Sequence, residues 1–325
     1  QTTNDPTPVL TGTAEAGSTV SVTVGGATYQ VTANSAGAWS LDTGVATPTS
    51  GSFNLGLDGL KNIALSSTDA AGNSTAGSGS LTLDTTAPDT PVTPTRYADD
   101  VAAVVNPAST APTTNDTTPG MNIGTGLTDT PSLYVDGQKV EAIYDPVTGT
   151  LTPVTPLTDG LHDLTYTLTD VAGNESEPSG ALKLTVDTTA PGHNPDGTPG
   201  TTPTPVVAIA EAGNGVNAQE ASDGVQTQVT LPTGTLEGDT VTLTLTHPDG
   251  STSTVNYTVT ANDLTAGAAT VTIPVPDISA ANGSYADGNY NVSASVTDAS
   301  GNQSLASAAT GLEGTVRRMP ISEPT

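Results

Sequence analysis

The sequence predicts an all-β protein of three tandem β-sandwich modules, and three observations support this prediction. Apolar and polar residues alternate in many short segments, as they do along strands that bury one face. Turn-forming residues separate these segments, with 35 Gly and 25 Pro in 325 residues. A cassette of fixed spacing also occurs three times, which indicates an array of similar modules.

The cassette is Asp-Gly, then an alternating segment, then Asp-x-x-Gly-Asn. Its two aspartates are 11 residues apart in every copy (69 − 58, 170 − 159 and 298 − 287). The pairs are Asp58 and Asp69, Asp159 and Asp170, and Asp287 and Asp298. Each alternating segment predicts one half-buried strand. The inward residues are Ile63 and Leu65 in the first copy, Leu164, Tyr166 and Leu168 in the second, and Tyr290, Val292, Ala294 and Val296 in the third.

Thr-Thr-Ala-Pro follows the last predicted strand of the first two modules and marks a linker, because Pro cannot donate to a strand ladder. The modules therefore cover residues 1–88, 89–191 and 192–315, followed by a tail at 316–325. A Thr-Asn-Asp block occurs at Thr3–Asp5 in module one and at Thr114–Asp116 in module two. Tyr97–Val101 precedes the block of module two and has no counterpart in module one. We therefore expect module one to lack its first strand. Module three lacks the block and belongs to a different subtype.

About seven short strands per module, with turns between them and no helix, are typical of an immunoglobulin-like sandwich. Three such domains in series predict an extended rod. With strands of about ten residues rising about 3.3 Å per residue, its length is on the order of 100 Å.

The chain is strongly acidic, with 33 Asp and Glu against 6 Lys and Arg and a formal charge of −27. Nucleic acids and anionic membranes are poor partners for it, because both attract Lys and Arg. The carboxylates either solvate the surface or bind cations. There is no cysteine, so disulfides cannot stabilise the modules. No stretch approaches the roughly 20 apolar residues of a membrane span, and we expect no membrane insertion.

The topology of the sandwich places the carboxylates at two poles. The loop between the last two strands lies where the first strand begins, and the last strand ends at the opposite pole. The pole that faces the preceding module carries Asp69, Asp170 and Asp298. The pole that faces the next module carries Asp5, Asp58, Asp84, Asp99, Asp100, Asp116, Asp159 and Asp187. We therefore expect acidic sites where neighbouring modules of one monomeric chain meet.

Ca²⁺ is the ion that suits such sites best. It accepts about six to eight oxygens in flexible geometry, including backbone carbonyls and Asn amides, whereas Mg²⁺ requires a tighter octahedron. Zinc is a poor fit to a chain with no cysteine and three scattered histidines. Glu211, Asn214, Asn217 and Glu220 form either a further site within module three or a plain solvated loop.

Every one of these aspartates also has a second interpretation, as a turn former. Asp-Gly and Asp-x-x-Gly-Asn are ordinary turn sequences, because Asp bonds to the nearby backbone and Gly adopts positive φ. Repetition does not separate the two interpretations, since repeated modules also repeat their turns.

Several motifs together resemble a known family. They are Val/Leu-Asp-Thr-Thr-Ala-Pro, Thr-Asn-Asp-x-Thr-Pro, Thr-Asp-x-Ala-Gly-Asn and the Gly12–Ser18 segment. The combination is similar to the bacterial immunoglobulin-like (Bap-like) extender repeats of large RTX-type adhesins, which type I secretion exports. The resemblance covers nearly all of residues 3–191 and implies a calcium-stiffened stalk outside the cell, at the bacterial surface. Module three resembles another adhesin repeat.

The sequence therefore favours a structural extender with Ca²⁺ at its interdomain junctions. We expect no enzyme, because no nucleophile elbow, phosphate loop or zinc motif occurs. The alternative is a module that binds a sugar, a peptide or a partner adhesin, and the atypical module three is its expected place.

Overall fold

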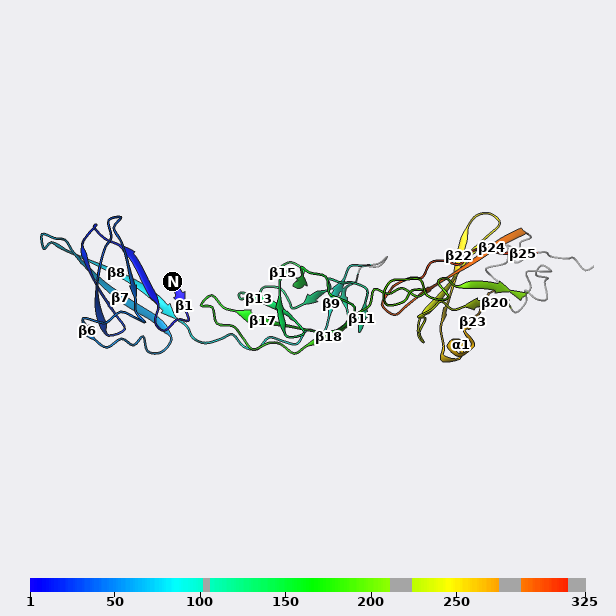
Figure 1. Cartoon of the computed structure of the whole chain (residues 1–325), viewed down its shortest axis with the longest axis horizontal. Coiled ribbons are helices and arrows are strands. Elements are labelled where there is room, and N and C mark those ends of the chain that lie inside the picture. The colour runs from blue at the N-terminus through cyan, green and yellow to red at the C-terminus, as the bar shows by residue number, and fades with distance from the viewer. Residues whose placement is uncertain (102–105, 211–223, 275–287, 315–325) are drawn as a thin grey trace, which may run out of the picture. The chain divides into compact units, whose positions relative to one another are not determined.

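The structure is a computed structural model and describes residues 1–101, 106–210, 224–274 and 288–314 (Figure 1). Strands in several sheets dominate it, which confirms the all-β prediction. The chain divides into two compact units whose boundary runs through module two. The first unit comprises residues 1–98, 120–155 and 163–182, and the second comprises 99–119, 156–162 and 183–325.

Module one has a large and a small sheet, in the orders β1-β8-β7-β3-β4-β6 and β2-β5. The strands are β1 (Thr2–Thr3), β2 (Val9–Thr13), β3 (Thr19–Val24), β4 (Ala27–Thr32), β5 (Ala38–Asp42), β6 (Ser50–Gly51), β7 (Gly59–Thr68) and β8 (Ser74–Leu83). Alternation turns Val20, Val22 and Val24 of β3 inward, where they share one core with Trp39 and Leu41 of β5. β1 runs parallel to the end of β8.

Module two has sheets in the orders β10-β9-β12-β16-β15 and β11-β18-β17-β13-β14. The strands are β9 (Tyr97–Asp99), β10 (Asn106–Ser109), β11 (Thr113–Thr114), β12 (Gly120–Asn122), β13 (Thr130–Val135), β14 (Gln138–Val140), β15 (Ala142–Asp145), β16 (Thr150–Pro153), β17 (Gly160–Thr169) and β18 (Leu182–Val186). β9 pairs with β12 and sets Tyr97 opposite Met121, and both side chains are fully buried. β11 runs parallel to β18, as β1 does to β8.

Module three has sheets in the orders β19-β20-β23 and β22-β21-β24-β25. The strands are β19 (Val206–Ile209), β20 (Val225–Thr230), β21 (Thr240–Thr246), β22 (Thr252–Thr258), β23 (Ala268–Ile273), β24 (Gly288–Thr297) and β25 (Thr310–Gly314). A short helix, α1 (Ala261–Ala266), shows that the expectation of no helix was wrong. A capping box between Thr260 and Asp263 begins it and Gly267 at φ 70° ends it, so local capping outweighs its short length.

In every module the cassette forms a core strand and the corner that follows it. Its alternating segments are β7, β17 and the described part of the third copy, β24. Their inward residues are buried as predicted, except that Leu65 and Leu168 are only half-buried. Asp287 of the third copy lies outside the described residues.

The core of module three predicts a large difference between two leucine substitutions. Leu243 on β21 is 1% exposed, so Leu243→Ala should lower the free energy of unfolding by about 2–5 kcal/mol. Leu305 is 64% exposed, so Leu305→Ala should change it by less than about 0.5 kcal/mol. Urea unfolding followed by circular dichroism measures both, and equal losses would contradict this packing.

Candidate metal sites at the module poles

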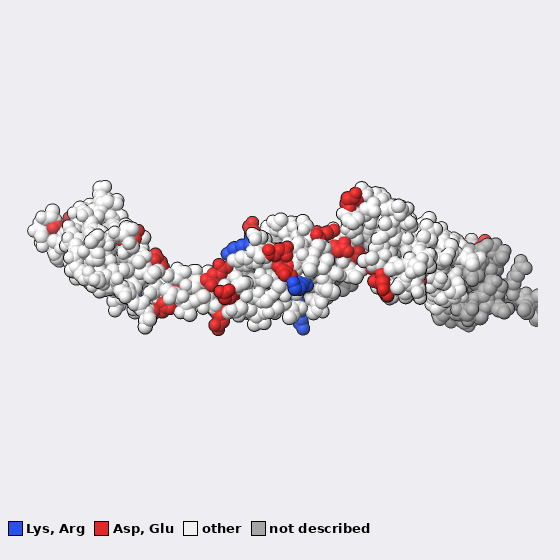
Figure 2. Space-filling model, turned by 60° about the horizontal axis from the view of Figure 1, so that its bottom comes forward, with Lys and Arg blue, Asp and Glu red and all other residues white. Residues whose placement is uncertain are grey.

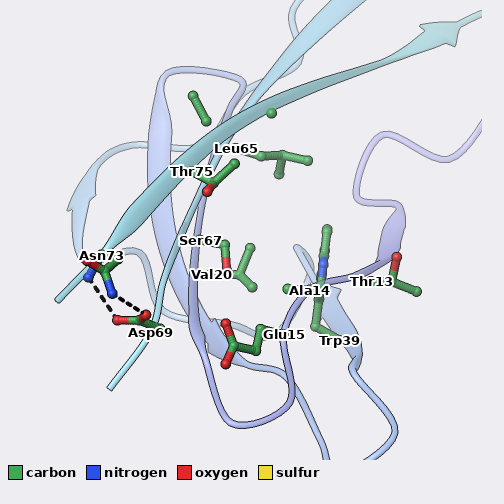
Figure 3. A pocket seen from close by; sticks show the side chains of 12 residues that line it. Thr13, Ala14, Glu15, Val20, Trp39, Leu65, Ser67, Asp69, Asn73 and Thr75 are labelled. Atoms are coloured by element: carbon green, nitrogen blue, oxygen red, sulfur yellow. Dashed lines mark hydrogen bonds between the residues drawn. The ribbon is translucent and has the colours of Figure 1, made fainter. Parts of the chain in front are cut away.

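The tip loop, which we define as residues 69–73, 170–174 and 298–302, is closed by its own aspartate. In each copy, Oδ1 of the aspartate accepts a hydrogen bond from the backbone N–H of the last Asn, at 2.8 to 2.9 Å. Oδ2 accepts from the side-chain Nδ2 of the same Asn, at 2.6, 2.8 and 2.9 Å in chain order. Figure 3 shows this pair for Asp69 and Asn73. The turn-forming role is therefore real in all three copies.

The asparagine of the second and third tip loops has another partner. Asn174 Nδ2 also donates to the backbone oxygen of Asp84 at 2.8 Å, within the first unit. Asn302 Nδ2 donates to the backbone oxygen of Asp187 at 2.7 Å, within the second unit. The second and third tip loops thus each contact the residue that follows the last strand of the preceding module.

The Thr-Asn-Asp block contacts the same loop. Asn4 N–H donates to Ala172 O at 3.2 Å, and Asn115 N–H donates to Ser300 O at 3.1 Å. Gly173 and Gly301 follow these carbonyls with φ of 97° and 96°, a conformation that favours glycine. The same three-part contact of block, tip loop and strand end therefore occurs twice.

The charges in the two copies differ. Side-chain donation from Asn174 lowers the pKa of the Asp170 carboxyl below its ordinary value. Burial instead raises the pKa of Asp298, and the negative charge of Asp187 raises it further. The second contact therefore holds carboxylates that repel one another.

Asp239 belongs to this second group, although the sequence analysis did not select it. It is 2% exposed, and its Oδ2 accepts from Leu236 N–H at 2.8 Å. Burial raises its pKa, and the charges of Asp298 and Asp187 add to the shift. The signal was its motif, Gly-Asp-Thr-Val, which matches Gly-Ser-Thr-Val in module one and replaces the buried Ser18 by a carboxylate.

Two carboxylate oxygens of module two are buried without a hydrogen bond of normal geometry. Asp116 is 1% exposed, and its Oδ1 accepts from Thr118 N–H at 2.7 Å. Its Oδ2 forms no hydrogen bond of normal geometry, although the nearby Asp100 N–H partly stabilises the charged carboxylate. Asp99 Oδ2 accepts from the Thr114 hydroxyl at 3.0 Å while its Oδ1 has no partner. Burial raises the pKa of Asp116, and the charge of Asp100 raises it further. A buried unsatisfied polar group costs about 1–3 kcal/mol, so both oxygens require an explanation such as an ion.

The corresponding residue of module one has a different environment. Asp5 is exposed, and its Oδ1 accepts from Thr7 N–H at 2.8 Å. β9 carries Asp99 beside the block of module two, and module one has no such strand among its described residues. Among the described residues, the aspartate of this motif is therefore exposed in module one and buried in module two.

Asp58 and Asp159 hold the threonines of the linkers. Asp58 accepts from the hydroxyls of Thr85 and Thr86, both at 2.9 Å, and donation from Thr86 is the main reason that its pKa is lowered. Asp159 accepts from the hydroxyls of Thr188 and Thr189 at 2.8 and 3.3 Å. Their positions give both carboxylates a structural role as linker caps.

The remaining predicted ligands have fewer features that favour a metal site. Asp84 and Asp187 each accept from the backbone N–H two residues later, at 3.2 and 3.0 Å. Asp100 is exposed. The possible site in module three lies outside the described residues, and it comprises Glu211, Asn214, Asn217 and Glu220.

The donor set is made of oxygens. Within the described ranges, no three Asp, Glu, His or Cys side chains converge closely enough to hold an ion by themselves. Ca²⁺ also uses backbone carbonyls, Asn amides and water. Both contacts contain backbone carbonyls and an Asn amide. On the face drawn in Figure 2, Asp and Glu far exceed Lys and Arg, so few cationic side chains are available to neutralise them. These oxygen donors fit a hard cation. The buried carboxylates that such an ion would neutralise, Asp116, Asp239 and Asp298, all lie in the second unit.

Module three shows little that favours a binding site for a sugar or peptide. Of its aromatic side chains in the described ranges, Tyr290 is 2% exposed and Tyr257 donates its hydroxyl to Asp263 at 2.8 Å. Neither belongs to an exposed aromatic cluster.

Comparison with known proteins identifies the class. The chain matches the bacterial Ig-like domain over residues 1–85 and 106–188, more than half of its length, and belongs to this family. No curated protein matches it.

Several solved structures are similar to the chain and cover 96% of it. One is a tetra-tandem repeat in the extending region of a large adhesion protein, with 21% identity, 73% of that chain covered and a TM-score of 0.30. Another is a Ca²⁺-stabilized adhesin with which an Antarctic bacterium reaches out and binds ice, with 26% identity, 69% covered and a TM-score of 0.34. A third is a bacterial ice-binding adhesin, with 21% identity, 91% covered and a TM-score of 0.28. These low scores carry no functional argument.

The raised pKa of Asp239 predicts a pH-dependent gain from Asp239→Asn in the absence of metal. A raised carboxyl pKa means that the folded state disfavours the charged form of Asp239. The parent protein is therefore not destabilised by this group below its ordinary pKa of 3.8, and it loses free energy of unfolding as pH rises from there through the raised pKa. The variant should therefore melt several degrees above the parent at neutral pH in EDTA, and the difference should vanish near pH 4.

Asp249→Asn is the matched control in the same module. The Ser251 hydroxyl lowers the pKa of Asp249, so its charged form stabilises the fold and the variant should melt below the parent at neutral pH. Thermal unfolding across this pH range measures both differences. A destabilised Asp239→Asn at neutral pH in EDTA would contradict the electrostatic account.

Proposed function

We propose that the chain is a structural extender segment of a bacterial surface adhesin, stabilised by Ca²⁺ where neighbouring modules meet. One observation carries the proposal, the buried oxygens of Asp99 and Asp116 that form no hydrogen bond of normal geometry. The mutually repelling group of Asp187, Asp239 and Asp298 supports it.

The energetics favour a cation at these positions. Two carboxylates about 4 Å apart repel by roughly 4 kcal/mol at an effective dielectric constant near 20. An ion that binds only the folded, docked modules removes this repulsion. At a concentration one hundred times its dissociation constant, it would stabilise them by about 2.7 kcal/mol per site.

The tandem organisation supports a spacing role. The family is that of bacterial Ig-like domains, and Asp58 and Asp159 order the linkers between modules through their threonines. A chain without cysteine needs another means of fixing its junctions outside the cell, and Ca²⁺ is one. We place the chain at the bacterial surface and assign it a structural, non-catalytic role. Within the described residues, no helix is both long and apolar enough to span a membrane.

Removal of calcium should loosen the chain. Addition of millimolar Ca²⁺ to EDTA-treated protein should raise the melting temperature and narrow the distribution of dimensions in small-angle scattering. Mg²⁺ at the same concentration should do less, because the flexible oxygen donors suit the larger ion. Unchanged melting and scattering in Ca²⁺ and EDTA would sink the proposal.

Two substitutions test which aspartates bind calcium. Asp116→Asn and Asp298→Asn should each weaken calcium binding by at least about tenfold, since each removes a charged oxygen donor worth more than about 1.4 kcal/mol. Asp249→Asn changes an exposed turn of module three and should leave binding unchanged. Isothermal titration gives the affinities, and an equal effect of all three variants would count against these positions.

A further inference from the structure

The linker between modules two and three folds back on itself. Both linkers begin with Asp-Thr-Thr-Ala-Pro, and the next residue is Asp89 in the first and Gly192 in the second. Gly192 has a φ of 99°, and a Cβ at this position would collide with the backbone oxygen of Pro203. Glycine is therefore required for the second linker to turn here.

The linker hairpin, which we define as residues 192–200, is held together by its own hydrogen bonds. Asn194 N–H donates to Thr198 O, and Gly200 N–H donates to Gly192 O, both at 2.8 Å. Asn194 Nδ2 also donates to the Thr198 hydroxyl at 3.1 Å. These bonds join amides, carbonyls and a hydroxyl, so the hairpin forms without a metal ion.

The linker hairpin is attached to one residue of module three, Thr233. The backbone oxygen of Thr233 accepts from Gly192 N–H at 2.7 Å, and Thr233 N–H donates to Thr202 O at 2.9 Å. The Thr233 hydroxyl accepts from Thr202 N–H at 2.9 Å. A Cβ on Gly200 would lie 2.5 Å from the Thr233 Cβ, so the two segments are in close contact. Module three therefore holds the linker on both sides of the hairpin.

Module two holds the same linker a few residues earlier. Asp159 accepts from the Thr189 hydroxyl at 3.3 Å, and the attachment to module three begins at Gly192. Only Ala190 and Pro191 lie between the two attachments, and Pro191 is buried and restricts the backbone. All of these residues belong to the second unit. The linker therefore connects the two modules through a short and restrained segment.

The first linker has a longer exposed segment. Asp58 accepts from the Thr86 hydroxyl at 2.9 Å, as Asp159 does from its threonines. Asp89, Thr90 and Val92 then follow and are exposed. Within the described residues, none of these three donates a hydrogen bond to either module. The linker itself therefore adds little restraint at the first junction.

We propose that the linker hairpin is a metal-independent attachment that fixes module three to module two, and that the first junction is the hinge of the chain. Domains joined by an exposed linker move relative to one another unless a large interface prevents it. The second linker removes that freedom because it is bonded to both modules within a few residues. This assignment goes beyond the calcium proposal, since it attributes the rigidity of the second junction to the linker.

Distances between spin labels in EDTA test the proposal on the full chain. The chain has no cysteine, so introduced pairs can be labelled specifically. Val147→Cys with Thr254→Cys spans the second junction, and Val147→Cys with Val45→Cys spans the first, all at exposed positions. The distance distribution should be at least about twofold wider for the first pair than for the second. Equal widths would overturn the proposal, whether or not any further variant folds.

Substitutions of Thr233 test the attachment itself. Thr233→Val keeps the shape of the side chain but removes the acceptor of Thr202 N–H. It should widen the second distribution and speed hydrogen exchange at the Gly192 and Thr202 amides by at least about tenfold, because the linker opens locally. Thr233→Ser keeps the hydroxyl and should change neither. Unchanged width and exchange in Thr233→Val, with slow exchange retained at Leu243 in the core, would contradict the proposal.

Two glycine substitutions test the close packing of the linker. A Cβ at Gly200 meets Thr233, whereas a Cβ at Gly311 meets nothing within 4 Å, and neither glycine has a positive φ. Gly200→Ala should therefore widen the second distribution, and Gly311→Ala should not. Equal effects of the two would count against the attachment. Because calcium is absent throughout, failure of these tests leaves the calcium proposal untouched, and failure of calcium binding leaves these tests unchanged.

Discussion

The two hydrogens of one side-chain amide are the constraint on which the described contacts between modules depend. In Asn174 and Asn302, one bond goes to the aspartate that opens the tip loop and the other to a backbone carbonyl beyond the preceding module's last strand. The first bond fixes the conformation of the loop, and the second joins the loop to the preceding module. In the second and third tip loops, one side-chain amide therefore serves both turn formation and contact between modules.

This device places carboxylates close together as a by-product. Where the surroundings are open, as at Asp170, hydrogen bonds stabilise the charge. Where Asp239 is buried beside the same geometry, the charges of Asp187, Asp239 and Asp298 are left in mutual repulsion. One sequence motif therefore produces two electrostatic environments, and the difference is set by burial and by the neighbouring charges rather than by the motif itself.

The repeated spacing and the alternation of apolar residues were sufficient to predict the all-β class and the core strand of each cassette. They identify Tyr166 and Val292 as buried because period-two alternation leaves a strand residue few alternatives. The helix α1 was missed because a single turn stabilised by Thr260 and Asp263 has no apolar periodicity to detect. Asp239 was missed because burial is a tertiary property, and its motif resembles an ordinary strand start.

The residues of the candidate site were also only partly predictable from the sequence. Sequence reasoning grouped Asp58 and Asp159 with the other carboxylates, but their threonine partners lie 27 to 30 residues away and follow only from the fold. Asp5 and Asp116 share one motif and could not be distinguished before β9 was placed. The sandwich topology predicted many acids at the poles, whereas the solvation of each acid depends on which residues cover it in the fold.

The paired use of the tip-loop amide also makes the chain sensitive to chemical ageing. Conversion of the Asn302 side-chain amide to a carboxylate by deamidation would remove the donor to Asp187 O. A new carboxylate would then face Asp298 and stand near Asp187, adding repulsion where burial already disfavours charge. The loss of this one amide would therefore weaken the contact in two ways at once, by removing a donor and by adding a charge.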